Sequence, residues 1–201
     1  LIVEQANADE KGFNKGRLYN TAVKYILENV HGQNGNVVDC IVMHDVDLVP
    51  AKHSDTLGER GDYRCRQMPW HIYHLATKST RRYSQFLTGG VLSMRLAHFC
   101  DVNGMSNQYF GWGAEDDDFQ LRMFNSGFCV MRPKQPRQDS APPFLMLPHQ
   151  SFGKSNPNRF AMLVQAVEMQ RVDGLSNVES LAVVDRVKLL NAFTHLVFKI
   201  L

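Results

Sequence analysis

Residues 109–118 hold the densest group of side chains that could do chemistry. The run Tyr-Phe-Gly-Trp-Gly-Ala-Glu-Asp-Asp-Asp places Trp112 between Gly111 and Gly113, directly before four consecutive carboxylates. An indole face packs on the apolar face of a sugar ring, and a carboxylate can accept hydroxyl hydrogen bonds or act as general base. The two glycines would let the Trp112 loop move. Helix capping explains one or two of these carboxylates but not four, so the pattern favours a sugar site.

A second acidic group follows a short apolar run. Residues 37–43 are rich in β-branched side chains, which indicates a buried parallel strand, and they lead into His44-Asp45-Val46-Asp47. Open α/β sheets bind ligands at the carboxyl ends of their strands, and both Asp side chains would point to the same side. Two hard oxygen ligands there suit Mg²⁺ or Mn²⁺ bridging to a diphosphate. Taken alone, the motif is evenly balanced between such a site and a simple turn.

The elements that must position these groups alternate along the chain. Apolar residues at helical spacing predict helices over residues 18–27, 95–102, 116–126 and 160–167. Apolar β-rich runs predict strands over residues 1–4, 37–43, 89–93, 128–131 and 193–200. The polar stretches 51–67 and 133–143 indicate loops. This alternation predicts an α/β fold with a mainly parallel sheet flanked by helices.

Composition sets limits on the class of protein. With 201 residues, 44% hydrophobic and 21% charged, the chain is an ordinary globular domain with one core. A net charge of +2 without a long basic run gives no signal for nucleic-acid binding. No apolar stretch approaches the roughly 20 residues of a membrane span. Cys40, Cys65, Cys100 and Cys129 form no Cys-x-x-Cys pair, which disfavours structural zinc and leaves three full pairings, or free thiols, open.

One competing interpretation comes from the acidic pair itself. Asp45-Val46-Asp47-Leu48-Val49 matches the Asp-x-Asp-x-Val start of haloacid dehalogenase-like phosphatases, in which Asp45 would be a nucleophile. That chemistry needs a Ser or Thr and a Lys at later strand ends. Ser93 and Lys134 are the only passable candidates, and neither is convincingly placed.

The motifs together resemble the β-1,4-galactosyltransferase family. In order, they are Asp45-Val46-Asp47, Gly89-Gly90-Val91, Asn103-Gly104, residues 111–118 and Arg132-Pro133. Further matches are Phe13-Asn14-Lys15, Tyr63-Arg64-Cys65, Met146 with His149, residues 156–160 and Asp173-Gly174-Leu175. The resemblance implies a GT-A-like nucleotide-sugar-binding fold, with a catalytic domain over residues 1–180. Residues 181–201 would form a divergent C-terminal segment packed on the same domain.

The resemblance also assigns roles to individual residues. Asp47, Met146 and His149 match the family's manganese ligands, although a thioether is a soft ligand for a hard ion. The implied donor-binding residues are Phe13, Asn14, Lys15, Asp45, Val46, Asp47, Leu87, Trp112 and His149. The implied acceptor-binding residues are Trp112, Ala114, Glu115, Asp116, Arg159, Phe160 and Leu163. Lys15 replaces an arginine, and its point charge cannot copy the arginine's bidentate fork.

The implied reaction is an inverting sugar transfer from a UDP-sugar donor to a glycan acceptor. Asp116, with Glu115 beside it, would take the proton from the acceptor 4-hydroxyl while Mn²⁺ stabilises the departing diphosphate. Ala114 stands where the family has glycine, so a positive φ there would be strained by about 1 kcal/mol. The polar segment 149–160 would form a lid.

Sequence leaves the two sugars open. Met43-His44 and residues 103–107 resemble the family's xylose-accepting branch. Cys65, the Met-x-x-His spacing and Arg159-Phe160 resemble the branch that accepts N-acetylglucosamine, which is favoured. Galactose is the expected donor sugar. Leu87, or Phe86 with a one-residue insertion, aligns with the donor-selecting tyrosine, and an aliphatic side chain there would also admit N-acetylgalactosamine.

The resemblance bears on cellular location as well. Cys40 and Cys65 align with a family disulfide, which implies the Golgi lumen, whereas Cys100 and Cys129 are expected to be buried thiols. The family's first strand, stem and membrane anchor have no counterpart here, so we expect an N-terminally truncated member of a type II membrane protein family. A chain without that strand could instead be an inactive fragment or a carbohydrate-binding module.

Overall fold

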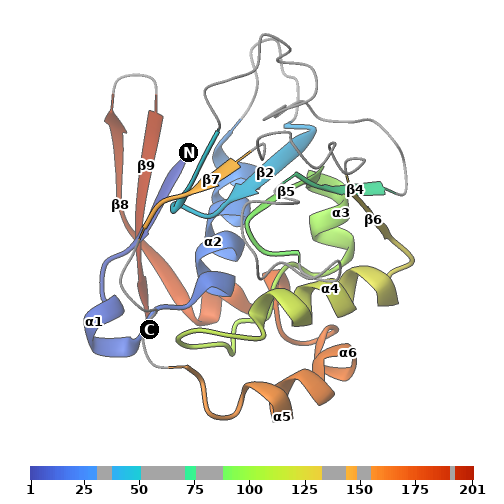
Figure 1. Cartoon of the computed structure of the whole chain (residues 1–201). Coiled ribbons are helices and arrows are strands. Elements are labelled where there is room, and N and C mark those ends of the chain that lie inside the picture. The colour runs from blue at the N-terminus through green and yellow to red at the C-terminus, as the bar shows by residue number, and fades with distance from the viewer. Residues whose placement is uncertain (31–37, 51–70, 76–87, 133–143, 149–154, 191–192) are drawn as a thin grey trace, which may run out of the picture.

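The structure is a computed structural model that describes residues 1–30, 38–50, 71–75, 88–132, 144–148, 155–190 and 193–201. Helices and strands alternate along the chain and gather into two larger sheets and one two-stranded ribbon (Figure 1). No helix in these ranges is both long enough and apolar enough to cross a bilayer.

A four-stranded sheet carries the site. Its order is β2-β5-β4-β6, with bounds Cys40–His44, Val91–Arg95, His71–His74 and Cys129–Met131. Strands β2 and β4 both run antiparallel to β5, and only the β4–β6 pair is parallel. The register places Met43 opposite Leu92, so the carboxyl end of β2 lies beside the start of β5.

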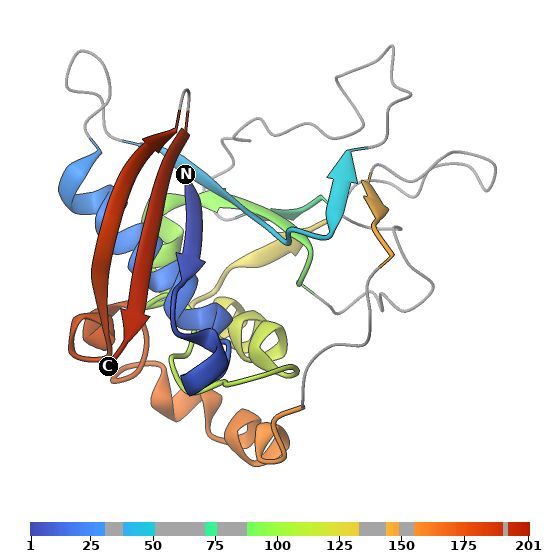
Figure 2. The same cartoon turned by 90° about the vertical axis from the view of Figure 1, so that its left-hand side faces the viewer.

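The second sheet joins the two ends of the described chain. Its order is β1-β9-β8, with bounds Ile2–Gln5, Phe193–Ile200 and Ala182–Leu190 (Figure 2). Strand β1 is parallel to β9, and β8 is antiparallel to it. Asn7 ties the turn after β1 to the last strand, because its side chain both donates to and accepts from the backbone of Ile200. A short ribbon pairs β3, Leu48–Pro50, with β7, Phe144–Met146.

Helix α2, Lys15–Asn29, lies between the two larger sheets (Figure 1). Leu18 packs with Phe198 of β9, whereas Val23 packs into the core under the four-stranded sheet. The other helical segments are α1 at Ala8–Lys11, α3 at Leu96–Asp101, α4 at Glu115–Asn125, α5 at Arg159–Val164, α6 at Ala166–Met169 and the 3₁₀ helix η2 at Leu175–Ser180. The helices expected from apolar spacing are all present, the last one divided into α5 and α6 at Gln165.

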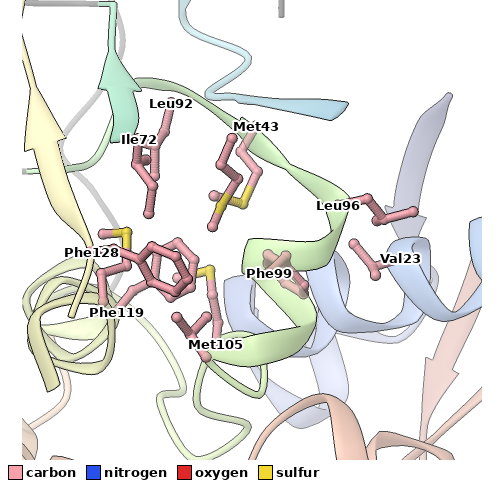
Figure 3. Close-up of a cluster of buried hydrophobic side chains, with 12 residues drawn as sticks. Val23, Met43, Ile72, Leu92, Leu96, Phe99, Met105, Phe119 and Phe128 are labelled. Atoms are coloured by element: carbon pink, nitrogen blue, oxygen red, sulfur yellow. The ribbon is translucent and has the colours of Figure 1, made fainter. Parts of the chain in front are cut away.

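The main hydrophobic core fills the space between the four-stranded sheet and its helices. Figure 3 shows Ile72, Leu92 and Met43 from the strands above Phe119 of α4 and Met105. Each of these side chains is at least 93% buried, and burying one such side chain contributes about 1.5–3 kcal/mol. The core therefore fixes α4, the element that begins with the run of carboxylates, beneath the ends of β2 and β5.

A buried polar network ties α4 to two loops. The Arg122 guanidinium donates to the Asp118 carboxylate over 2.6 Å and to the backbone carbonyl of Asp173 over 2.6 Å. The Asp173 carboxylate also accepts from the Ser106 hydroxyl over 2.6 Å and from the amide of Asn107 over 3.1 Å. Because every one of these groups is buried, each needs its partners in place.

Two expectations about the strands need correction. The described sheets are mixed, with antiparallel pairings in the majority, rather than mainly parallel. Among the described elements, β3 and β4 lie between β2 and β5 along the chain, and β2 pairs antiparallel with β5. Residues 37–43 were expected to form a buried strand, yet in β2 only Met43 is fully buried. The expected loops at 51–67 and 133–143 lie outside the described residues.

Candidate functional site

The four carboxylates at the start of α4 do different work. Ala114 precedes the helix with a φ of +71°, the left-handed conformation that was expected to strain an alanine at this position. Asp118 points into the core, where it pairs with Arg122 and accepts from the Tyr109 hydroxyl over 3.1 Å. Asp118 therefore has a structural role, whereas the Asp116 carboxylate lies beside Lys15 and Asp45.

An ammonium group joins the two acidic motifs. Lys15 Nζ lies 2.8 Å from Asp45 Oδ1 and 3.0 Å from Asp116 Oδ1. Lys15 is held in place because it begins α2 directly after Asn14, whose side chain caps the helix by accepting from the backbone amide of Arg17. Three segments that are far apart in sequence therefore meet at one cluster of charges.

Two glycines permit this close approach. The Gly90 amide donates to Asp45 Oδ2 over 3.0 Å, and the Asp45 amide donates to the Gly90 carbonyl over 2.8 Å. A Cβ atom added to Gly89 would lie 2.2 Å from Asp116 Oδ2, so a side chain at position 89 would displace that carboxylate. The Thr88 hydroxyl donates to the Asp116 carbonyl over 2.9 Å. The segment 88–90 thus holds both carboxylates against Lys15.

A pocket opens over this cluster. It is lined by Lys15, Tyr19, Met43, Asp45, Thr88, Gly89, Gly90, Leu92, Met105, Asp116 and Phe119. Its floor is apolar and its charged side chains come from the first turns of α2 and α4 and from the end of β2. Its free volume is only about 10 Å³, so the charged and polar groups converge here on a nearly filled crevice.

The electrostatics of the cluster suit a base. Burial raises the pKa of Asp116, and the neighbouring Lys15 ammonium opposes that rise. Burial and the charge of Asp116 also raise the pKa of Glu115. Burial alone would lower the pKa of Lys15, but Asp116 and Asp45 outweigh it and hold that pKa well above its ordinary value. A carboxyl with a raised pKa in a pocket is a candidate general base.

The Trp112 loop meets the start of α5. Trp112 is about half exposed, and its carbonyl accepts from the amide of Asn156 over 3.2 Å. A Cβ added to Gly113 would lie 2.9 Å from the Arg159 side chain, and the Arg159 guanidinium stacks 4.6 Å from the ring of Phe160. The Gly113 amide donates to the Glu115 carboxylate over 2.9 Å. The structure thus brings together the residues expected to bind an acceptor sugar, with Leu163 half-buried on the same helix α5.

Two of the three expected metal ligands also lie close together. Met146 in β7 pairs with Leu48 in β3, and the amide of Leu147 donates to the Asp47 carbonyl over 2.7 Å. The Asp47 and Met146 backbones are therefore neighbours across the ribbon, as a shared ligand set requires. His149 lies outside the described residues. Within the described ranges no three His, Cys, Asp or Glu side chains form a metal cluster, so this set depends on the Met and on His149.

The remaining expected donor residues fall into different places. Phe13 and Val46 are exposed, at 47% and 94%, and neither lines the pocket. Asn14 is fully buried, and its side-chain amide donates to the Asn107 carbonyl over 2.8 Å, so it has a capping role that sequence reasoning missed. Leu87 lies outside the described residues.

The phosphatase alternative is not supported by the strand positions. Ser93 would have to stand at the carboxyl end of a strand to contact a substrate phosphate. It lies instead in the middle of β5, 98% buried and paired with Val42 on one side and Tyr73 on the other. Lys134 lies outside the described residues.

His74 supports the pocket from behind, and sequence reasoning missed it. Its Nε2 lies 2.6 Å from the Gly89 carbonyl, and its Nδ1 lies 2.5 Å from Arg132 Nη1. Burial lowers the pKa of His74 to about 4, so the ring is neutral, with Nε2–H donating to Gly89 and Nδ1 accepting from Arg132. A single histidine in an apolar strand carries no sequence signal for such a role.

The cysteines require one correction. Cys100 and Cys129 are free thiols, as expected, but neither is fully buried: Cys100 is half-buried, and Cys129 is exposed because its position in β6 points outward. Cys65 lies outside the described residues, so its pairing with Cys40 stays a prediction.

Comparisons with known proteins agree on one group. A family model described as the N-terminal domain of galactosyltransferase matches residues 71–150. Human β-1,4-galactosyltransferase 5 is 32% identical over 187 residues, which are 90% of this chain and 42% of that protein. Human β-1,4-galactosyltransferase 4 is 33% identical over 174 residues, which are 85% of this chain and 46% of that protein. The chain therefore spans less than half the length of these curated relatives.

A solved structure extends the likeness to the fold. It is a Drosophila β-1,4-galactosyltransferase 7 mutant in complex with manganese, UDP-Gal and xylobiose. It is 28% identical in sequence, with a TM-score of 0.69, and the match covers 99% of this chain and 78% of that one. The predicted GT-A-like α/β fold is confirmed, with mixed sheets in place of a mainly parallel one.

Proposed function

The chain belongs to the β-1,4-galactosyltransferase family, and we propose that it carries the catalytic site of an inverting, Mn²⁺-dependent galactosyltransferase. The proposed donor is UDP-galactose, and the proposed acceptor is the 4-hydroxyl of a terminal N-acetylglucosamine on a glycan. The catalytic domain would extend over residues 1–180, with residues 181–201 packed on it.

The observation that carries this proposal is the position of Asp116. Its carboxylate lies in the pocket beside Asp45, is paired with Lys15, and has a pKa raised by burial, while the Thr88 hydroxyl holds the Asp116 backbone carbonyl. A base so placed can remove the acceptor hydroxyl proton as that oxygen attacks the anomeric carbon of the donor sugar. The bond from the anomeric carbon to the diphosphate oxygen breaks as the new glycosidic bond forms, which inverts the anomeric centre.

The metal site is proposed from the two-stranded ribbon that β3 and β7 form. Asp47 and Met146 lie next to each other there and would hold Mn²⁺ together with His149. The Asp47 carboxylate is the hard ligand that such an ion prefers, and the thioether of Met146 is a soft one. When bound, the ion supplies Lewis-acid stabilisation of the charge on the departing diphosphate.

The acceptor site is proposed from the contact between the Trp112 loop and α5. Trp112 supplies a half-exposed aromatic face, Glu115 is fixed by the Gly113 amide, and Phe160 lies 65% exposed beneath the Arg159 guanidinium. An aromatic face beside a carboxylate is suited to a sugar ring. A xylose acceptor is the second candidate, because the related Drosophila enzyme is in complex with xylobiose.

Turnover assays test the reaction and both sugars. UDP-galactose and UDP-N-acetylgalactosamine are each offered with N-acetylglucosamine or xyloside acceptors, with Mn²⁺ and again after chelation. We expect transfer from UDP-galactose to N-acetylglucosamine that is lost with EDTA and reduced at least about 100-fold in Asp116→Asn. Preference for UDP-N-acetylgalactosamine would instead follow from Leu87. Turnover with none of the pairs would overturn the enzyme proposal, and acceptor-sugar binding without metal-dependent UDP binding would identify a carbohydrate-binding module.

We propose in addition that the full-length protein is membrane-anchored and faces the Golgi lumen. The lumenal location rests on the expected Cys40–Cys65 disulfide, which needs an oxidising compartment. The membrane anchor rests on the family resemblance alone. Peptide mapping without reductant should recover those two cysteines in one crosslinked product. Two free thiols at these positions would contradict a lumenal location.

A further inference from the structure

Lys15 occupies a position that its own helix does not favour. It is the first residue of α2, where the helix dipole is positive and cations are destabilised. Its side chain is nevertheless largely buried, 16% exposed, and directed at two carboxylates. The carboxylates of Asp45 and Asp116, rather than the helix, therefore decide where this ammonium lies.

The Lys15 ammonium covers the proposed base. Lys15 Nζ lies 3.0 Å from one oxygen of Asp116 and 3.4 Å from the other, so both oxygens that could accept a proton already face a donor. Asp45 is anchored on its other side, because its Oδ2 accepts from the Gly90 amide. Asp116 is restrained by α4 and by Thr88. Lys15, with four rotatable bonds, is the member of this cluster that is free to move.

We propose that Lys15 is a positioning residue whose contacts change when the donor binds. In the donor-free site its ammonium ties Asp116 to Asp45, and the diphosphate of a bound UDP-sugar draws that ammonium away, which releases Asp116 to act as base. The inference rests on the proposed function, because that function gives Asp116 its role as base and brings the diphosphate to Asp47, two residues after the Asp45 that Lys15 contacts. No covalent bond changes in this step, and Lys15 keeps its proton throughout.

The charges around the pocket support such an exchange. Asp116 is faced by Lys15 and Tyr19 from α2, by Asp45 after β2, and by its neighbours Glu115 and Asp117 on α4. Burial raises the pKa of Tyr19, so its phenol is neutral and adds no charge. Lys15 is the only cation among the described residues that line the pocket. A diphosphate entering this site must compete with the carboxylates for that single ammonium.

The residue type strengthens the inference. The family resemblance places an arginine at position 15, and a guanidinium fork has five donors that can contact a carboxylate and a phosphate from different edges. The lysine ammonium is a compact point charge on a flexible stem. The ammonium therefore breaks its ion pair with Asp116 as it approaches the diphosphate. This coupling of donor binding to the release of Asp116 requires lysine rather than arginine at position 15.

Carboxyl ¹³C NMR of the whole chain tests the proposal directly. The Asp116 signal is assigned by its absence in Asp116→Asn and titrated with and without saturating UDP and Mg²⁺, while calorimetry reports binding separately. We expect UDP to raise the Asp116 pKa by about one unit or more, because an opposite charge at this distance lowers a carboxyl pKa by about 1–3 units. In Lys15→Met the pKa should already be raised without UDP, and UDP should add little.

Two further variants make the test specific. Lys24→Met removes another lysine from the same helix, one that pairs with Glu28 and Glu179 at the surface, and should behave as wild type. Lys15→Arg should fold and show a smaller UDP-induced shift than wild type. An equal shift in wild type and Lys15→Met, or bound UDP with no shift in wild type, would overturn the role of Lys15 and leave the proposed function standing. Failure of UDP to bind at all would overturn both.

Discussion

At the scale of single residues, the site depends on the close packing of the Gly89 backbone against the Asp116 carboxylate. Gly89 lies so close to Asp116 that an added Cβ would be 2.2 Å from the carboxylate oxygen. Ala114, by contrast, is an alanine in a conformation that favours glycine. Replacing Gly89 should therefore be harmful, whereas replacing Ala114 with glycine should be favourable.

Gly89→Ala should lower kcat/KM by about 100-fold, because a displacement of about 1 Å at a reacting group has effects of that order. Gly127→Ala is the matched control, since Gly127 has a φ of +81° and nothing within 4 Å of an added Cβ. It should cost about 1 kcal/mol of stability through strain and leave turnover unchanged. Steady-state kinetics and urea unfolding separate the two effects. Equal turnover in both variants would contradict the packing of Gly89 on Asp116.

Ala114→Gly should raise the free energy of unfolding by about 1 kcal/mol, because it removes the strain of a left-handed alanine at φ +71°. Ala161→Gly on the exposed surface of α5 is the control and should lower it by about 0.5–1 kcal/mol. Urea denaturation of both variants measures the difference. A loss of stability in Ala114→Gly would mean that position 114 is not left-handed in solution.

At the scale of elements, α4 is the part on which the site depends most. Its first turn presents Asp116 to the pocket, and Asp118 and Arg122 of the same helix fix it to the loop that contains Asp173. The orientation of Asp116, the proposed base, is thus set by an ion-pair network on the opposite side of the same helix.

Arg122→Met should lower the free energy of unfolding by about 3–5 kcal/mol, because Asp118 and Asp173 would be left as uncompensated buried charges. Arg186→Met on strand β8 is the control, since Arg186 is 57% exposed and its pairing with Asp185 is a surface ion pair. Its effect should stay within about 0.5 kcal/mol. Chemical denaturation that gave similar losses for both arginines would argue against the buried network.

Sequence could predict the helices better than the sheets. Apolar spacing locates α2 and α4, because burial of one helix face leaves a period of 3.6 residues. The direction of β2 against β5 left no such trace, since a short apolar run looks the same whichever way its neighbour runs. The same limit applies to the site. Motifs predicted Asp116 as a site residue, whereas the contacts of Lys15 and His74 depend on distances between segments that sequence does not contain.

At the scale of the whole molecule, stability should depend on pH through His74. Its pKa is about 4 in the folded protein, against 6.5 for an exposed histidine. The unfolded chain therefore binds more protons between these values, so the contribution of His74 is complete above pH 6.5 and is lost as the pH falls towards 4. The loss amounts to about 3 kcal/mol.

His74→Gln tests this directly, because glutamine can donate to the Gly89 carbonyl without titrating. The fall in unfolding free energy between pH 6.5 and 4 should be shallower in the variant than in wild type, by an amount of the order given above. The difference between the two curves cancels the contributions of the other titrating groups. Parallel curves would show that His74 is not held neutral.

The pairing of β1 with β9 also sets an order of events during folding. Ile2 lies opposite His195, so this sheet cannot close until almost the whole described chain is available. Gln5 at the end of β1 accepts from the amide of Asn14, the residue that caps α2 directly before Lys15. The charge cluster should therefore mature late, and pulse-labelled hydrogen exchange during refolding should protect the amides of α4 before those of β1 and β9. Simultaneous protection would mean that the long-range sheet closes together with the local structure.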